Sequence, residues 1–371
     1  MRKKVRNKRL YLLETLVLLL LIVSYIQIQD KHILNQPSQV ESGFLDLTQW
    51  QADDTLTLDG TWEFYPHRLL DPTALNFDAH RSDVHFIQVP ASLSQTSNNS
   101  FTSGTYRLRI QVPEDGMFAI KTRTIRSAYN LYINGILLHT SGTTSTNIHE
   151  VEINSRYAML PFRSLDQHIE LVIQVASDER SLNVSGIINS IEFGTYPMIQ
   201  RQHYMDVALS MITITLLFTV GAYFIVRFLF QRSLVHNFYF GWMSIIFAFF
   251  LSLMDEQIMS IFINYNFTQR LALQGLCATS LIIVMSHFID SVFDRVIPKS
   301  FIQFANRLIL FSTALIALNA LFFNLDSSFF YMIYLFGLIN SVLYSLVTVF
   351  MSLKKSDETT NFAYIFLLNI S

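Results

Sequence analysis

The chain has 371 residues, of which 51% are hydrophobic and only 15% are charged, with a formal net charge of −2. Soluble domains carry about 25% charged residues, so the composition excludes a wholly soluble protein, and disorder is excluded because it requires low hydrophobicity. The near-neutral charge gives no electrostatic basis for nucleic-acid binding. The single cysteine, Cys277, excludes a disulfide within the chain and a cysteine-based zinc site.

The N-terminus is predicted to be a membrane-targeting segment. Six basic residues lie within residues 1–9, and residues 10–28 form a hydrophobic segment that is long enough to span a bilayer. Two interpretations stay open: an uncleaved signal anchor, or a signal peptide with no obvious cleavage site. Both predict that the residues that follow lie outside the cytoplasm.

A polar block follows, and its pattern predicts a β-rich extracellular or periplasmic domain over residues 40–200. Alternation is clear in residues 104–113, where apolar residues share one face and Arg107 and Arg109 share the other. Asn-Gly is the pair favoured where both central residues of a two-residue turn have positive φ, so Asn134-Gly135 predicts a hairpin. The further candidate strands and the hairpin are 55–65, 85–89, 117–124, 128–139, 169–175 and 187–193. About eight short strands with regular turn signals predict a β-sandwich or jelly roll.

Residues 205–371 are predicted to form an all-α polytopic transmembrane array. Five apolar runs of 22–26 residues are separated by short polar breaks, and each can cross the hydrocarbon core with some tilt. These runs are 206–230, 238–263, 270–293, 301–322 and 328–353. A truncated sixth run begins at residue 361, so we expect the chain to be a piece of a longer protein.

The charges in the loops predict the orientation of this array. If the β-rich domain is outside, the inner loops carry basic pairs, as the positive-inside rule requires. These inner pairs are Arg227 and Arg232, Arg295 and Lys299, and Lys354 and Lys355, and they add to the basic N-terminus. The outer loops instead hold Asp255, Glu256 and Asp326. A multi-pass protein of the cell membrane is therefore expected.

Five motifs, in order, resemble those of a carbohydrate-binding-like jelly roll. They are Leu58–Tyr65, Val89–Leu93, Gly104–Arg109, Ala128–Gly135, and Ile173–Ala176 followed by Ser185–Gly194. The same domain type occurs as the sugar-binding module of family 2 glycoside hydrolases. Followed by a helical array, it resembles the bacterial seven-transmembrane receptors with diverse intracellular signalling modules, over about residues 45–371.

The resemblance implies a sensor domain outside the membrane, seven helices and a cytoplasmic histidine kinase, diguanylate cyclase or phosphatase. This sequence contains neither the last helices nor an output module, so we expect no enzymatic activity, cofactor or metal in it. The expected partners are a small ligand, with carbohydrate as the class that the resemblance suggests, the lipid bilayer and a second copy of the chain. Two alternatives stay open: an extracellular docking or scaffold module on a membrane anchor, and a transporter.

Four residues of the β-rich domain are candidates for ligand binding. Trp62 is a stacking platform for a sugar ring or, alternatively, a core side chain. Arg107 and Arg109 are candidates to hydrogen-bond a ligand. The alternative is that they belong to a solvated sheet face. His139, at the end of the predicted hairpin, is a candidate rim group near the loop 139–150.

Two ionisable residues of the predicted helices are also candidates. His287 and Asp290 lie at i and i+3, so they share a helix face near the predicted inner end of their span. Ionisable residues within a membrane are expensive and are often functional, so this pair is a candidate for a proton relay. The alternative is that both residues lie at the inner interface and end the helix.

Overall fold

A computed structural model gives the fold of the chain. It describes residues 40–51, 54–72, 76–92, 103–123, 125, 127–154, 157–164, 166–177, 185–254, 257–265, 267–292 and 299–318, and five positions between 339 and 347. The predicted N-terminal segments 1–9 and 10–28 lie outside these residues, as do the run from 361 and most of the predicted span 328–353. The chain divides into two compact units, with the boundary between Asp206 and Val207.

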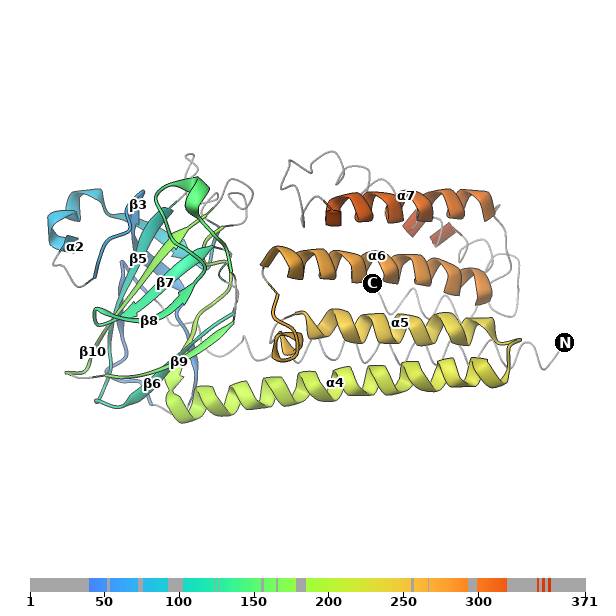
Figure 1. Ribbon diagram of the computed structural model, residues 1–371. Helices are drawn as coiled ribbons and strands as arrows, with labels where there is room; N and C mark the ends of the chain where they lie inside the picture. The colour runs from blue at the N-terminus through green and yellow to red at the C-terminus, as the bar shows by residue number, and fades with distance from the viewer. Residues whose placement is uncertain are drawn as a thin grey trace. The chain divides into compact units, whose positions relative to one another are not determined.

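The first unit contains two β-sheets (Figure 1). The larger sheet comprises β1 (Phe44–Asp46), β3 (Gly60–Pro66), β4 (His85–Val89), β5 (Ser103–Gln111), β7 (Ala128–Ile133), β8 (Ile136–Ser141) and β10 (His168–Ala176), in the order β4-β3-β5-β10-β7-β8, with β1 parallel to β5. The smaller sheet comprises β2 (Leu56–Thr57), β11 (Glu192–Thr195), β6 (Met117–Thr122) and β9 (Ala158–Arg163), in that order. Three short helical segments, α2 (Asn76–Ala79), η2 (Arg81–Asp83) and η3 (Ile148–Glu150), lie between strands. The predicted N-terminal β domain is therefore confirmed.

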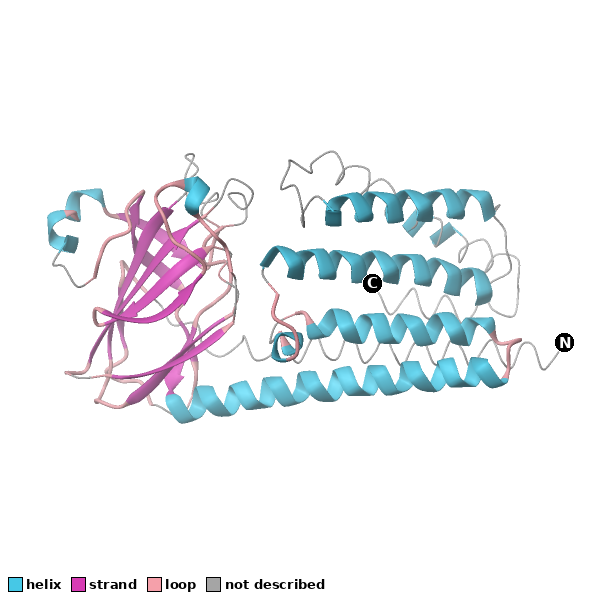
Figure 2. Ribbon diagram, in the orientation of Figure 1, coloured by secondary structure: helices cyan, strands magenta, loops and turns pink. Residues whose placement is uncertain are grey.

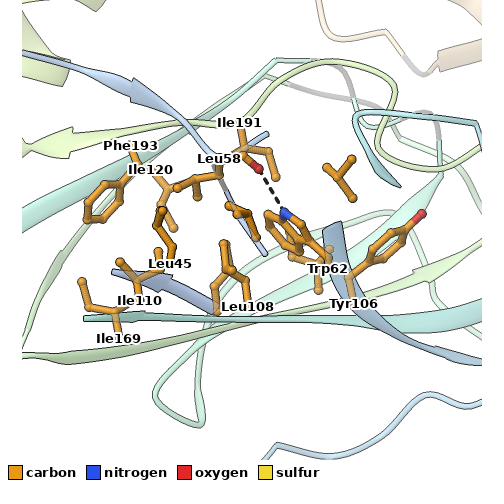
Figure 3. Close-up of a cluster of buried hydrophobic side chains, with 14 of the residues drawn as sticks. Leu45, Leu58, Trp62, Tyr106, Leu108, Ile110, Ile120, Ile169, Ile191 and Phe193 are labelled. Atoms are coloured by element: carbon orange, nitrogen blue, oxygen red, sulfur yellow. Dashed lines mark hydrogen bonds between the residues drawn. The ribbon is translucent and has the colours of Figure 1, made fainter. Parts of the chain in front are cut away.

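Alternating residues of both sheets form one shared core, so the two sheets pack face to face. Trp62 and Leu108 of the larger sheet and Ile120 and Phe193 of the smaller sheet have no measurable exposure (Figure 3). This is the inward half of a period-2 pattern, and it leaves Arg107 on the opposite face of its strand. The predicted division of β5 into an apolar face and an arginine face is thus observed.

The hairpin of β7 and β8 turns where the sequence places it. Asn134 and Gly135 both have positive φ, at 49° and 79°. The ladder shifts register between Leu131 and Tyr132, so β8 contains a bulge near Leu138. Because of this shift, His139 lies opposite Leu131, which is an inward-facing residue.

The second unit is helical, as Figure 2 shows. Its helices are α4 (Tyr196–Phe230), which begins in the first unit, α5 (Val235–Ser252), α6 (Phe267–Val292) and α7 (Lys299–Leu318), with the 3-10 turn η5 (Ile258–Ile261) after α5. By length and composition α4, α5 and residues 269–292 of α6 can each cross a membrane. Within the part of the chain that the structure describes, three helices are therefore suited to a membrane protein.

Two helix boundaries differ by ten residues or more from the sequence prediction. Helix α4 begins ten residues before the predicted start at residue 206, because its first three turns are polar and pack on the smaller sheet. Helix α5 ends at Ser252 rather than at 263, and Gln257 then adopts a left-handed conformation with φ 49°. Helices α4 and α5 approach closely at Gly221 and Gly241, where an added Cβ would lie 2.8 Å or less from the other glycine's carbonyl oxygen.

Candidate functional site

The outer face of the larger sheet carries an ion-pair network centred on Arg107. Strand pairing places Glu63 of β3 beside Arg107, and Glu170 of β10 beside Arg109. Arg107 donates from Nε and Nη2 to Glu170 Oε1, at 2.7 and 2.5 Å, and from Nη1 to Glu63 Oε2 at 3.3 Å. Arg109 donates from Nη2 to Glu63 Oε1 at 2.9 Å. The two arginines are therefore matched by two carboxylates.

The segment that contains α2 covers part of this network. The ring of Phe77 lies 4.4 Å from the Arg107 guanidinium carbon, so Arg107 is held between an aromatic face and two carboxylates. Leu70 ties the segment to the sheet, since its N–H donates to Thr105 Oγ1 and its carbonyl accepts from Gln174 Nε2. Figure 1 shows α2 beside β3, away from the smaller sheet.

The network leaves few groups available to a ligand. The Arg109 side chain is 49% exposed, whereas the Arg107 side chain is 19% exposed and the Glu63 side chain 10%. Burial, and then the charge of Glu63, raise the pKa of Tyr65, whose hydroxyl donates to Glu63 Oε2 at 3.2 Å. With two positive and two negative groups the cluster is neutral, so it is not built to attract an anion.

Arg107 and Arg109 are expected to differ in their contributions to stability. Arg107→Met removes both contacts to Glu170 and leaves the buried Glu63 with only the half-exposed Arg109, so it is expected to cost about 1–3 kcal/mol. Arg109→Met removes a half-exposed ion pair, which is worth less than about 1 kcal/mol. Denaturant unfolding of the two variants tests this order, and equal losses would contradict it.

The structure places the other two candidates of the β domain inside the sandwich. Trp62 is 0% exposed, and its indole Nε1 donates to the Leu58 carbonyl at 2.9 Å (Figure 3). A ring buried in this way offers no face to a sugar, so the stacking platform is corrected to a core side chain. His139 is half-buried 5.6 Å from the ring of Tyr129, and burial lowers the pKa of its imidazole. It lies in β8, within the predicted hairpin.

The two candidates of the helical unit both lie on α6 and are half-buried. His287 stacks on Tyr239 of α5, with ring centroids 5.5 Å apart and an interplanar angle of 19°. A polar contact between α6 and α7 joins Thr279 and Thr313, whose hydroxyls are 3.0 Å apart. Among the residues that the structure describes, no group of three or more His, Cys, Asp or Glu side chains is placed to hold a metal ion.

A second charged cluster lies on the outer face of the smaller sheet, under the first turns of α4. Lys121 of β6 is 0% exposed, and its Nζ lies 2.5 Å from Asp206 Oδ2 and 3.7 Å from Glu192 Oε2. The Asp206 side chain is 2% exposed. Arg123 donates to Glu192 Oε1 at 3.1 Å, so two cations again face two carboxylates. A buried lysine is rare unless it is paired, which makes this pairing a defining contact of the unit.

The first three turns of α4 make further contacts with the β domain around the Lys121–Asp206 pair. Ile199, which is fully buried, packs on Gly194, and Gln202 Nε2 donates to Glu192 Oε2 at 3.0 Å. His203 stacks on Tyr157 and is hydrogen-bonded to its hydroxyl at 2.8 Å. Strand β11 ends at Thr195 and α4 begins at the next residue, so no linker separates the sheet from the helix. The sandwich and residues 196–206 are therefore fastened together.

Sequence reasoning missed this second cluster. Lys121 follows four apolar residues of its strand, and Asp206 is the acidic residue at the start of a long uncharged run. A charge that borders an apolar run is the available signal for each. The two residues are 85 positions apart, so the sequence does not show that they meet.

Comparisons with known proteins give distant matches. No protein-family model and no curated protein matches the chain. Solved structures that match include a β-glucuronidase from Ruminococcus gnavus, with 13% identity, a TM-score of 0.28, and coverage of 38% of this chain and 29% of that enzyme. Another is a GH2 β-galacturonidase from Eisenbergiella tayi, with 9% identity, a TM-score of 0.27, and coverage of 39% and 25%. The chain thus spans less than a third of these enzymes, and TM-scores this low carry no argument about its fold or activity.

Proposed function

We propose that the chain is the sensing part of a membrane receptor, of the bacterial seven-transmembrane type that its motifs resemble. In this proposal the β-sandwich is a jelly roll outside the membrane that binds a small ligand, with a carbohydrate as the first class to test. The helices carry the signal inward to an output module that these residues do not include. The chain itself is not an enzyme, and the receptor acts as a homodimer.

The observation that carries this proposal is the fastening of α4 to the sandwich. A domain that only anchors or docks needs no rigid connection to its membrane helix, because a flexible linker is sufficient for that role. Here β11 runs directly into α4, and Lys121 holds Asp206 three turns into that helix. A shift between two arrangements of the sandwich would therefore move α4, provided that the ligand binds the two arrangements with different affinity.

The experiment follows the inner end of α4 while ligands are added outside. Ser233 is exposed in the turn between α4 and α5, so Ser233→Cys in a Cys277→Ser background accepts one environment-sensitive fluorophore. The full chain in lipid nanodiscs is titrated with glucose, glucuronate, N-acetylglucosamine and oligomers of each. We expect at least one saccharide to bind and change the emission, and Lys121→Met to remove that change while binding is retained.

One result would count against the sensor, and another against its ligand class. Binding with no change in emission would favour the docking module, in which the exposed Ile136 and Leu137 at the β7–β8 turn are a natural contact surface. The absence of binding to every member of the panel would remove carbohydrate as the ligand class. The matched control is Arg68→Met, which removes a half-exposed ion pair with Asp83 after β3 of the other sheet and is expected to leave the route through Lys121 intact.

A further inference from the structure

Helix α4 is longer than a bilayer requires. Its 35 residues extend about 52 Å at 1.5 Å per residue, whereas the hydrocarbon core is about 30 Å thick. Residues 207–226 contain no Asp, Glu, Lys or Arg, and they are bracketed by Asp206 and Arg227. This stretch of 20 residues is about 30 Å long and matches the hydrocarbon core. The first eleven residues of α4, 196–206, are therefore left outside the hydrocarbon.

These first turns have two different faces. Ile199 and Asp206 face the sheet and are 0% and 2% exposed. The other side carries Arg201, which is exposed, with Tyr204 and Met205 at 62% and 54% exposure. The spacing of three and four residues places these three side chains on one helix face. An exposed tyrosine and an exposed methionine beside an arginine have no obvious role in water, so this face requires a partner.

We infer that Arg201, Tyr204 and Met205 contact the phospholipid headgroups of the outer leaflet, and that the Lys121–Asp206 pair lies at the membrane surface. This inference rests on the proposed function for the side of the membrane. Met205 and Arg201 lie about 3 and 9 Å above Val207 along the helix, and the headgroup layer is about 5–7 Å thick on each side. The methionine therefore reaches the edge of the acyl chains, and the guanidinium reaches the phosphates.

The chemistry of the three side chains fits lipid headgroups. Tyrosine is enriched at membrane interfaces, where its ring is apolar and its hydroxyl is hydrated. Gln200 Nε2 bonds the hydroxyls of Tyr196 and Tyr204, at 2.8 and 3.4 Å, and so holds both rings along the helix. Arginine forms bidentate hydrogen bonds with phosphate. The uncharged stretch begins within three residues of this face, so the bilayer itself places headgroups against it.

Fluorescence quenching in vesicles tests the depth of this face. Met205→Cys, Met117→Cys and Leu216→Cys, each in the full chain with Cys277→Ser, are labelled with bimane and reconstituted into phosphatidylcholine. The vesicles contain a spin label either on the headgroup or at carbon 12 of the acyl chain. Met117 is the matched control, because it is a 49% exposed methionine of β6, about 13 Å along the strand from Lys121. Leu216 is 44% exposed near the middle of the uncharged stretch.

We expect the label at 205 to be quenched at least threefold more strongly by the headgroup spin label than by the chain spin label. The label at 216 should show the reverse preference, and the label at 117 should be quenched by neither. The inference would be overturned if the label at 205 preferred the chain spin label, as the label at 216 should. It would also be overturned if the label at 205 were quenched as weakly as the label at 117. The sensor proposal is judged separately at residue 233, since a response there is compatible with either depth of Met205.

Discussion

Lys121→Met is expected to lower the free energy of unfolding of the first unit by about 3–5 kcal/mol, the cost of breaking a buried ion pair from one side. The substitution keeps most of the side-chain volume and removes the charge, so Asp206 stays buried without its cation. Glu192 keeps Arg123 and Gln202, so the main loss is at Asp206. Denaturant unfolding followed by tryptophan emission measures this loss of stability. A Trp242→Phe background leaves only Trp50 and Trp62, which both lie in the first unit.

The double variant Lys121→Met, Asp206→Leu is the control for this prediction. Replacing a buried pair with apolar residues of similar volume is often close to neutral, so the double variant should recover at least half of the loss. A loss below about 1 kcal/mol in the single variant, which is the size of an exposed ion pair, would show that Lys121 is hydrated and would remove the basis for the fastening.

Trp62→Ala is expected to cost about 3–5 kcal/mol, because it opens a cavity in the shared core of the two sheets. Trp62→Phe keeps most of the ring and loses the hydrogen bond to Leu58, so about 1 kcal/mol of its cost comes from that bond. Phe86→Ala on the exposed outer face is the matched aromatic control, and it should change stability by less than about 0.5 kcal/mol. Near-ultraviolet circular dichroism during denaturation follows all three variants.

The same series separates the two interpretations of Trp62. A core tryptophan loses stability in proportion to the volume removed. A stacking platform would lose saccharide binding in Trp62→Ala while the stability stayed near that of the wild type, and that result would contradict the buried position of the ring.

The alternation of apolar and polar residues, together with the residue types at the turns, was enough to predict the β domain. Alternation in β5 placed Arg107 and Arg109 on one face, and Asn134-Gly135 placed the hairpin, because both signals are local. Strand β1 was missed because it has three residues and pairs in parallel with a distant strand. Strand β9 was missed because Pro161 interrupts its pattern, which an edge strand tolerates.

The candidate sites were harder to predict because they depend on tertiary pairing. The parity of β5 predicts an outward Arg107, but not that Glu63 and Glu170 neutralise it. The sequence predicts a rim position for His139, whereas a one-residue bulge, which leaves little trace in sequence, turns it inward. The start of α4 was missed because an apolar run reports only the part of a helix that faces lipid, and the first three turns face a sheet.

Native-state hydrogen exchange tests the central claim most directly, namely that the sandwich and the first three turns of α4 are one rigid body. The amides of residues 199–206 are compared with those of β6 in the full chain, without any ligand. We predict that the two sets open with the same free energy, because Lys121 and Ile199 join them, and that Lys121→Met lowers the protection of 199–206. Exchange at 199–206 that is tenfold or more faster than in β6 would show that the helix frays from the sheet, and it would contradict transmission through α4.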